Sequence, residues 1–198
     1  MRRLATIVTV ACLAVGLFGT GAARADGPVN TPPTGRFAFA CYGKSHPNLR
    51  CDKAALANIN RAHKAEGLGK MVLPENYASL TVTQQGIVVS NLERTIRGLP
   101  ALPGKHAYTQ LAKAGAVAGH DPSGPEGHAW GSVYIALADP LASDYFWMYW
   151  DGPGSLNPDC TQPSDPACFG HRNIILGDIW TGMGVGNQHA SMAQLFVQ

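Results

Sequence analysis

The stretch from Cys160 to Leu176 combines residue types and spacing that are suited to chemistry. Cys160 and Cys168 enclose a short polar loop, and His171 follows within three residues, at the start of an apolar helical run. Packing alone does not require a histidine here. In the first turn of a helix, the positive end of the helix dipole favours neutral imidazole, the form that binds a metal or accepts a proton. His171 is therefore a candidate site residue, and a histidine that only caps the loop by hydrogen bonds is the alternative.

The segments around this stretch predict the elements that position it. Apolar residues at helical spacing predict four helices before the second pair of cysteines, at residues 52–67, 80–97, 108–117 and 139–150. The last of these begins with Asp139 as its cap and Pro140 at its first position. Alternating patterns predict strands at residues 130–137, 179–186 and 191–197, the last two joined by Asn187-Gln188-His189. Helices and strands without βαβ alternation indicate an α+β fold with an antiparallel sheet.

The helix at 139–150 is rich in aromatic residues. Five of its six positions from 145 to 150 are aromatic: Tyr145, Phe146, Trp147, Tyr149 and Trp150. So many aromatic side chains must cover more than one face of the helix, and we expect some of them, Trp147 and Trp150 in particular, to line a cleft. His63, in the first predicted helix, lies on an apolar face and is expected to be a buried, hydrogen-bonded polar group.

The first 25 residues form a targeting segment. Arg2 and Arg3 precede an apolar run, and Ala23-Arg24-Ala25 is an A-x-A cleavage site. The sequence therefore predicts a secreted protein. Residues 26–40, rich in Pro, Gly and Thr at their start, are expected to be a flexible lead, and residues 41–198 to be one domain.

Composition excludes several classes of function. The chain carries 15 Lys and Arg and 13 Asp and Glu. Three of the arginines lie in the targeting segment, so the mature chain has a formal charge of −1. Without a basic run there is no electrostatic footprint for nucleic acid, and no later segment is apolar enough to span a bilayer. We expect a monomer.

Four cysteines remain after cleavage: Cys41, Cys51, Cys160 and Cys168. An even number in an exported chain predicts disulfides. Of the three possible pairings we favour the two local ones, Cys41–Cys51 and Cys160–Cys168, each of which adds roughly 2–3 kcal/mol by the chain-entropy relation. A four-thiolate zinc site is the alternative, and the wide spacing within each pair disfavours it.

The same stretch also carries a family resemblance. Gly170-His171-Arg172-Asn173-Ile174-Ile175-Leu176 resembles the GHR-x-N-I-L signature of bacterial members of the CAP superfamily (the SCP domain), with one residue fewer before the asparagine. Asn58-Ile59-Asn60-Arg61 with Gly67-Leu68 resembles the family's first-helix pattern, and Trp147-Met148-Tyr149 with Asp151-Gly152-Pro153 resembles its tryptophan-centred helix. These stretches occur in the family's order. The resemblance implies a three-layer α-β-α sandwich with a central antiparallel sheet.

The resemblance also implies a central cleft with two histidines and two acidic residues that can hold a divalent metal such as zinc. The second histidine corresponds to His171. The first corresponds to His120, with His128 as the alternative. One acid corresponds to Asp151, with Asp144 earlier on the same helix. At the position of the other acid this chain has Ser132, and Glu126 is the nearest replacement.

Two functions fit these residues, besides a third possibility, a purely structural or host-interacting surface protein with a vestigial cleft. The first is a secreted CAP-like binding protein that recognises a small apolar ligand or a cell-envelope component through a cleft near His171. The incomplete set of acids and the aromatic helix favour this role over turnover. The second is a metal-assisted hydrolase of peptide or envelope polymer, in which His120, His171 and Asp151 hold the ion and the ion activates water.

Overall fold

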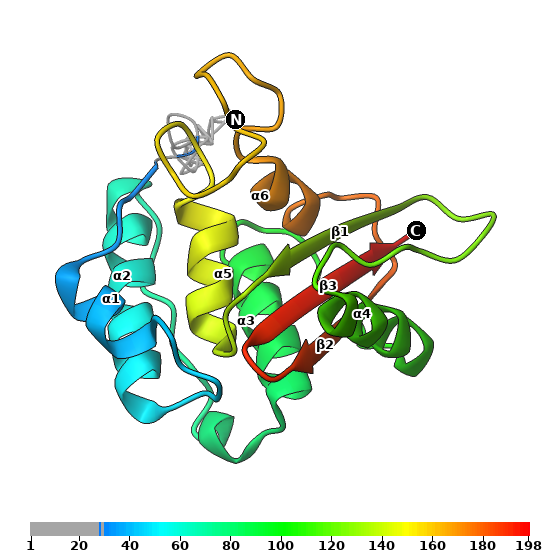
Figure 1. Ribbon diagram of the computed structural model, residues 1–198, viewed down its shortest axis with the longest axis horizontal. Helices are drawn as coiled ribbons and strands as arrows, with labels where there is room; N and C mark the ends of the chain where they lie inside the picture. Colours follow the sequence, from blue (N-terminus) through cyan, green and yellow to red (C-terminus); the bar gives the residue numbers. More distant parts are fainter. Residues whose placement is uncertain (1–27, 29) are drawn as a thin grey trace, which may run out of the picture.

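A computed structural model of the chain describes residue 28 and residues 30–198. The predicted targeting segment, residues 1–25, lies outside the described residues. The elements, in chain order, are α1 (Gly35–Cys41), α2 (Leu49–Ala65), a 3-10 turn (Tyr77–Ser79), α3 (Val82–Thr95), α4 (His106–Ala118), β1 (Trp130–Ile135), α5 (Pro140–Tyr149), α6 (Gly170–Ile175), β2 (Gly182–Gln188) and β3 (Ser191–Val197) (Figure 1).

The described strands form one antiparallel sheet in the spatial order β1, β3, β2. β3 is the last element of the chain and lies in the middle of the sheet, where Val197 faces Trp130 on one side and Gly182 on the other. After its first residue β3 is buried throughout. Its buried Gln194 accepts a hydrogen bond from Ser90 of α3 at 2.9 Å. The predicted α+β class with an antiparallel sheet is confirmed.

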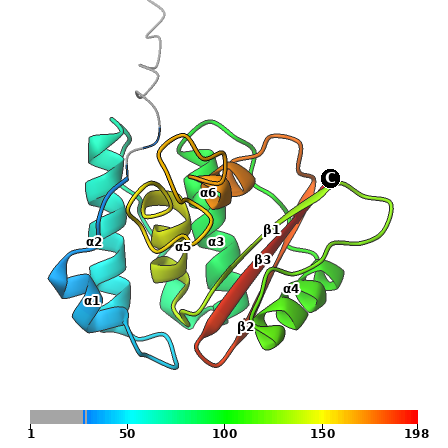
Figure 2. The same cartoon turned by 45° about the horizontal axis from the view of Figure 1, so that its top comes forward.

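Helices cover both faces of this sheet (Figures 1 and 2). α4 lies against β2 and β3 on one face, and α3 and α6 contact the sheet from the other, with α5 packed on them. A Cβ atom on Gly184 or Gly186 of β2 would meet backbone atoms of α4 at 2.1 Å, so glycine is what allows α4 to lie this close. The expected three layers are present. In addition, α2 packs on α5 and α1 on α2, which adds a further layer of helix.

The beginning of the domain differs from the sequence expectation. Residues 35–40, which we expected to belong to a flexible lead, form most of α1. Thr34 caps this helix by accepting a hydrogen bond from the Phe37 N–H at 3.3 Å, and the Phe37 side chain is fully buried. Its ring lies 4.8 Å from that of Tyr145 on α5. Sequence reasoning missed the helix because the partner of Phe37 lies far along the chain.

Most element ends are set by local capping. α2 begins at Leu49 and not at Asp52, because the side chain of Asn48 accepts a hydrogen bond from the Cys51 N–H at 3.0 Å. α5 begins as predicted: Asp139 accepts from the Ala142 N–H at 3.0 Å, and proline follows the cap. β1 ends at residue 135 and β2 spans 182–188, so these strands differ from the predicted ranges by two or three residues.

Candidate functional site

A cleft of about 350 Å³ opens beside the N-terminal end of α6. Its walls are mainly apolar, and its polar groups lie around Asp151 and His171. The residues that line it come from the loop after α1, the end of β1 and the turn that follows, the buried helix α5, the loop after α5, and α6: Tyr42, Gly43, Tyr134, Ile135, Ala136, Leu137, Phe146, Trp147, Trp150, Asp151, Leu156, Asn157, Pro158 and His171. The volume is in the range of small-molecule sites.

His171 and Asp151 form a hydrogen-bonded pair at the cleft wall. The Nδ1 atom of His171 lies 2.6 Å from Oδ1 of Asp151, and the backbone N–H of His171 donates to Oδ2 at 2.9 Å. Two contacts to one carboxylate fix the orientation of the imidazole ring. The ring's other nitrogen, Nε2, has no hydrogen-bond partner among the described residues, and the His171 side chain is 22% exposed. The pair therefore offers one ring nitrogen for an external partner.

The pKa of His171 is shifted in the direction opposite to the sequence expectation. Burial lowers the pKa of His171, but the hydrogen bond and charge of Asp151, with the charges of Asp121 and Asp159, outweigh it, so that the pKa lies above its usual value. We expected the helix dipole to favour the neutral ring. That expectation was wrong, because the Asp151 carboxylate itself lies at the N-terminal end of α6 and supplies a nearer, full negative charge.

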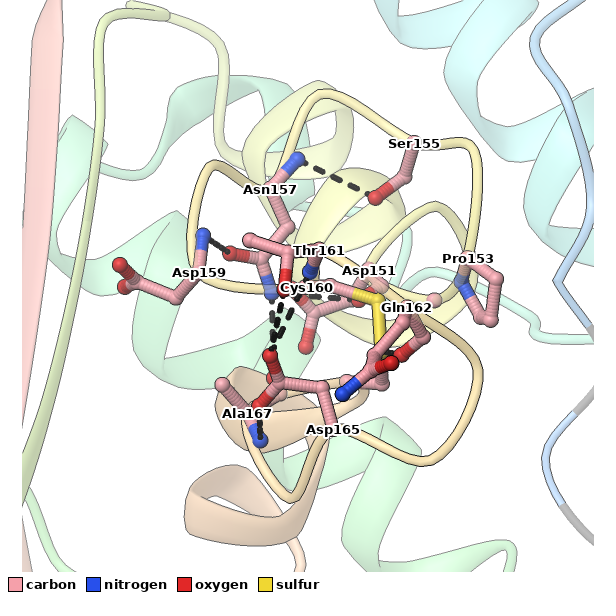
Figure 3. Close-up of a disulfide and its surroundings, with 12 residues drawn as sticks. Asp151, Pro153, Ser155, Asn157, Asp159, Cys160, Thr161, Gln162, Asp165 and Ala167 are labelled. Atoms are coloured by element: carbon pink, nitrogen blue, oxygen red, sulfur yellow. Dashed lines mark hydrogen bonds between the residues drawn. A yellow bond between two sulfur atoms is a disulfide. The ribbon is translucent and has the colours of Figure 1, made fainter.

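Asn157 holds Asp151 in place. Asp151 is almost fully buried, and the side-chain amide of Asn157 donates to its Oδ1 at 2.9 Å and to the carbonyl of Ala167 at 3.2 Å. Figure 3 shows these contacts inside the loop between α5 and α6. The backbone N–H of Phe169 donates to the Asp151 carbonyl at 3.1 Å. Sequence reasoning did not single out Asn157, whose place in an Asn-Pro turn indicates a loop but no partner.

The two local disulfides are present as favoured: Cys41–Cys51 and Cys160–Cys168. The second closes the far part of the same loop, where Asp165 accepts hydrogen bonds from the Ala167 N–H and the Thr161 hydroxyl, both at 3.0 Å (Figure 3). The four sulfur atoms are thus used in pairs, and the four-thiolate zinc alternative does not apply.

The other predicted histidines lie outside the cleft. His120, just after α4, is exposed, and its Nδ1 contacts the carbonyl of Asp121 at 2.7 Å. His128 is also exposed, with Nδ1 3.3 Å from the carbonyl of Gln198. Neither is among the residues that line the cleft. The expectation that one of them shares the cleft with His171 is therefore not met.

The predicted acids divide between the cleft and other parts of the fold. Asp151 lines the cleft. Asp144 is fully buried within α5, where burial and the charge of Glu93 raise its pKa well above the usual range. Glu126 is exposed in the loop before β1.

Ser132 lies on the wrong face of β1 for the missing acid. A Cβ at its neighbour Gly131 would contact Ile174 of α6, and because side chains alternate across a strand, Ser132 points away from α6.

Aromatic side chains of α5 form part of the cleft wall. Trp147 and Trp150 line the cleft, together with Phe146. The Trp147 indole N–H donates to the Tyr134 carbonyl at 3.3 Å, which joins α5 to β1 at the cleft wall. Within the described residues, no three His, Cys, Asp or Glu side chains form a group that can hold a metal ion. No described helix is long and apolar enough to cross a membrane.

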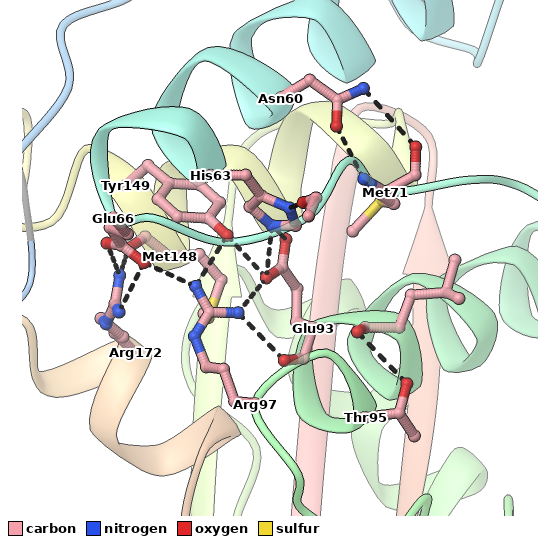
Figure 4. Close-up of polar contacts among 12 residues, drawn as sticks. Asn60, His63, Glu66, Met71, Glu93, Thr95, Arg97, Met148, Tyr149 and Arg172 are labelled. Atoms are coloured by element: carbon pink, nitrogen blue, oxygen red, sulfur yellow. Dashed lines mark hydrogen bonds and ion pairs between the residues drawn. The ribbon is translucent and has the colours of Figure 1, made fainter. Parts of the chain in front are cut away.

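A buried network of polar and charged side chains holds α6 in place through Arg172 (Figure 4). We call this network the Glu93 cluster; its members are His63, Glu66, Glu93, Arg97, Tyr149 and Arg172. Arg172, next to His171, donates to the two carboxylate oxygens of Glu66 at 2.6 and 3.0 Å and to the Met148 carbonyl at 3.0 Å.

Within the cluster, Arg97 bridges Glu66 at 2.8 Å and Glu93 at 2.5 Å, and the Tyr149 hydroxyl donates to Glu93 at 2.6 Å. The carboxylates of Glu66, at the end of α2, and Glu93, in α3, are thus neutralised by Arg97, just after α3, and Arg172, in α6. His63 is buried and hydrogen-bonded, as predicted.

The chain was compared with protein-family models, curated proteins and solved structures. No protein-family model matches the chain, and no curated protein matches it. One similar solved structure is an extracellular protein containing an SCP domain from Bacillus anthracis, with 19% identity and a TM-score of 0.45 over 64% of this chain and 44% of that chain. Another is a cysteine-rich secretory protein from Staphylococcus aureus, with 17% identity and a TM-score of 0.41 over 59% of this chain and 38% of that chain. The match spans less than half the length of each of these two solved chains.

Proposed function

We propose that this chain is a secreted, CAP-like binding protein that holds a small, mainly apolar ligand in the cleft beside His171. The targeting segment and the two disulfides support export. The signature residues 170–176 include α6, with His171 in its first turn. The observation that carries the proposal is the cleft itself: aromatic walls from α5 end at an oriented imidazole whose Nε2 is open. Binding pockets typically combine such apolar walls with a few fixed polar groups.

The charges around His171 narrow the ligand class. A protonated His171 is balanced by Asp151 at 2.6 Å, and Asp121 and Asp159 add negative charge nearby. The potential at the polar end of the cleft is therefore not positive, which disfavours a carboxylate or phosphate there. When the ring is protonated, which its raised pKa favours, a neutral oxygen such as a hydroxyl or a carbonyl can accept a hydrogen bond from Nε2 without this repulsion. We infer a ligand with an apolar body and one neutral oxygen. Cell-envelope molecules with these two features belong to this class.

Ligand binding in the cleft is tested with a dye and with a substitution that fills the cleft. Nile red, a neutral aromatic dye with one carbonyl, is titrated into the mature protein and followed by its fluorescence. Leu156 lines the cleft but is largely exposed, so Leu156→Trp adds bulk there at little cost in stability. We expect Leu156→Trp to weaken dye binding at least tenfold and His171→Gln to weaken it several-fold.

The matched control is Val72→Trp, since Val72 is equally exposed and does not line the cleft. We expect unchanged dye binding in this variant. Equal binding by wild type and Leu156→Trp would contradict the proposal. Native mass spectrometry of the exported protein then tests whether a neutral ligand that fits the cleft accompanies it.

A further inference from the structure

A second surface, on the far side of α5 from the sheet, has a different chemistry from the cleft. α1 and the first turns of α2 enclose a shallow groove of about 530 Å³. Its exposed lining consists of two apolar and three basic residues: Arg36, Phe39, Leu49, Arg50 and Lys53. We call these five residues the Phe39 surface. Figures 1 and 2 show α1 and α2 side by side at this edge of the molecule.

The apolar residues of the Phe39 surface have no cover within the described chain. Phe39 is 73% exposed and Leu49 is 64% exposed, whereas Phe37, two residues earlier, is fully buried. α1 therefore directs one phenylalanine into the core and presents the other to solvent. The guanidinium of Arg50 lies over the Phe39 ring at 5.6 Å from its centre, so a cation and an aromatic ring face outward together.

Charge is distributed unevenly between this surface and the cleft. Residues 30–65 hold six of the twelve Lys and Arg that follow residue 25. The single acid in that range is Asp52, which is half-buried near Asp139 and is not among the residues that line the groove. The loop at 151–169 holds three aspartates and no Lys or Arg. A chain with almost no net charge thus presents a basic face at α1 and α2 and an acidic one at the cleft loop.

The Phe39 surface is also held rigidly. The Cys41–Cys51 disulfide joins the last residue of α1 to the first turn of α2 directly beneath it, and both cysteines are buried. Asn48 caps α2 between them. The exposure of Phe39 and Leu49 is therefore a property of a fixed surface and not of a loose segment.

We propose that the Phe39 surface is a peripheral attachment site for membranes that contain anionic lipid. Exposed Phe and Leu that enter the headgroup region, flanked by Lys and Arg that contact anionic headgroups, form the combination that holds proteins at such interfaces. The three cations and the absence of an acid from the groove favour a negatively charged surface. Two apolar side chains are too few for an apolar protein interface, which buries on the order of 800 Å² per partner.

The test measures co-sedimentation of the mature protein with vesicles. We expect binding to vesicles of phosphatidylglycerol and phosphatidylcholine, weak binding to phosphatidylcholine alone, and a loss of binding as salt increases. Arg50→Glu with Lys53→Glu should lower binding at least 25-fold, since each cation contributes about fivefold near an anionic surface. Phe39→Ser with Leu49→Ser should also lower it at least tenfold. All four side chains are exposed, so the variants retain the fold, which circular dichroism checks.

α4 supplies matched controls, because it lies on the opposite side of the sheet from α2. Val117→Ser and Lys113→Glu, both at exposed positions, should bind vesicles like the wild type. Phe39→Trp should show a blue shift of its fluorescence on anionic vesicles. The cleft variant Leu156→Trp should bind vesicles normally, so failure of the cleft proposal leaves this one standing.

Three outcomes would overturn the proposal. The first is equal binding to anionic and neutral vesicles. The second is unchanged binding after Phe39→Ser with Leu49→Ser, which would reduce the interaction to general charge attraction. The third is binding to a soluble polyanion such as polyphosphate but not to anionic vesicles, which would assign the surface to a polymer instead of a lipid.

Discussion

The part of the chain that the structure describes contains two histidine–carboxylate pairs, and they differ in whether both ring nitrogens of the histidine have a partner. In the Glu93 cluster, Nε2 of His63 lies 3.1 Å from Glu93 and Nδ1 lies 2.7 Å from the carbonyl of Gly69, and both side chains are fully buried. At the cleft, Nδ1 of His171 lies 2.6 Å from Asp151, and the other ring nitrogen is open. Both ring nitrogens of His63 therefore have hydrogen-bond partners, whereas only one ring nitrogen of His171 has one among the described residues.

This difference separates a structural pair from a candidate binding group. Glu93 also accepts hydrogen bonds from Arg97 and Tyr149, so its negative charge is met on several sides and its pKa is lowered despite complete burial. The carboxylate oxygens of Asp151 accept hydrogen bonds from the His171 ring and from the His171 backbone N–H at the start of α6. A histidine beside an acid is therefore not by itself a sign of function, and the open Nε2 at an apolar cleft is the feature that supports the proposed binding role of His171.

The two pairs are also connected through neighbouring residues. Arg172, which follows His171, forms an ion pair with Glu66, and Glu66 forms one with Arg97 beside Glu93. The Glu93 cluster thus fixes α6 through Arg172, and the His171–Asp151 pair lies at the neighbouring residue in the same helical turn. We therefore expect the His63–Glu93 pair to control the stability of the fold and the His171–Asp151 pair to control ligand binding in the cleft.

Glu93→Gln should have the largest effect on stability. It removes the charge that Arg97 and His63 face in a fully buried place, and loss of one partner of a buried ion pair costs roughly 3–5 kcal/mol. Urea unfolding measures the change. Glu75→Gln, at an exposed position, is the matched control and should change the free energy of unfolding by less than about 0.5 kcal/mol. A loss below about 1 kcal/mol for Glu93→Gln would show that the cluster does not act as a charged unit.

The sequence was sufficient where the decisive contacts are local. Asp139 and Pro140 predicted the start of α5, and the even number of cysteines, paired locally, predicted the Cys160–Cys168 disulfide. It was not sufficient where partners lie far apart. Glu93 was not noticed as the partner of His63, because the two lie on different helices that meet only in the folded core.

The candidate site was predicted unevenly for the same reason. His171 and Asp151 were found from the signature and the aromatic helix. His120 was assigned by position in the chain, but the end of α4 turns it to solvent. Ser132 occupies the position that the resemblance gives to the second acid; it does not line the cleft, and the alternation of side chains along β1 directs it away from α6.

Asp151→Asn should have an intermediate effect on stability and a specific effect on His171. The variant retains an oxygen for the His171 backbone N–H but loses the negative charge beside Nδ1, which should cost about 1–2 kcal/mol. Without that charge, burial dominates and the pKa of His171 should fall below that of the wild type. Titration of the ring by NMR measures this. Asp178→Asn, at an exposed position after α6, is the control. An unchanged His171 pKa in Asp151→Asn would mean that Asp151 does not set the charge of the ring.

The smallest expected effect is the pH dependence that His171 adds to stability. Because the folded-state pKa of His171 is raised above its usual value of 6.5, the protonated ring stabilises the fold. This contribution is complete below that usual value and is lost as the pH rises through the raised pKa. The advantage of wild type over His171→Gln should therefore be greatest near pH 5.5 and should decline by pH 8.5, by an amount on the order of 1 kcal/mol. His46→Gln, at an exposed position in the loop after α1, is the control, because it also removes one histidine and so makes the same change in net charge. Urea unfolding at several pH values gives the two curves, and curves that stay parallel from pH 5.5 to 8.5 would show that the open pair contributes binding geometry but no linked stability.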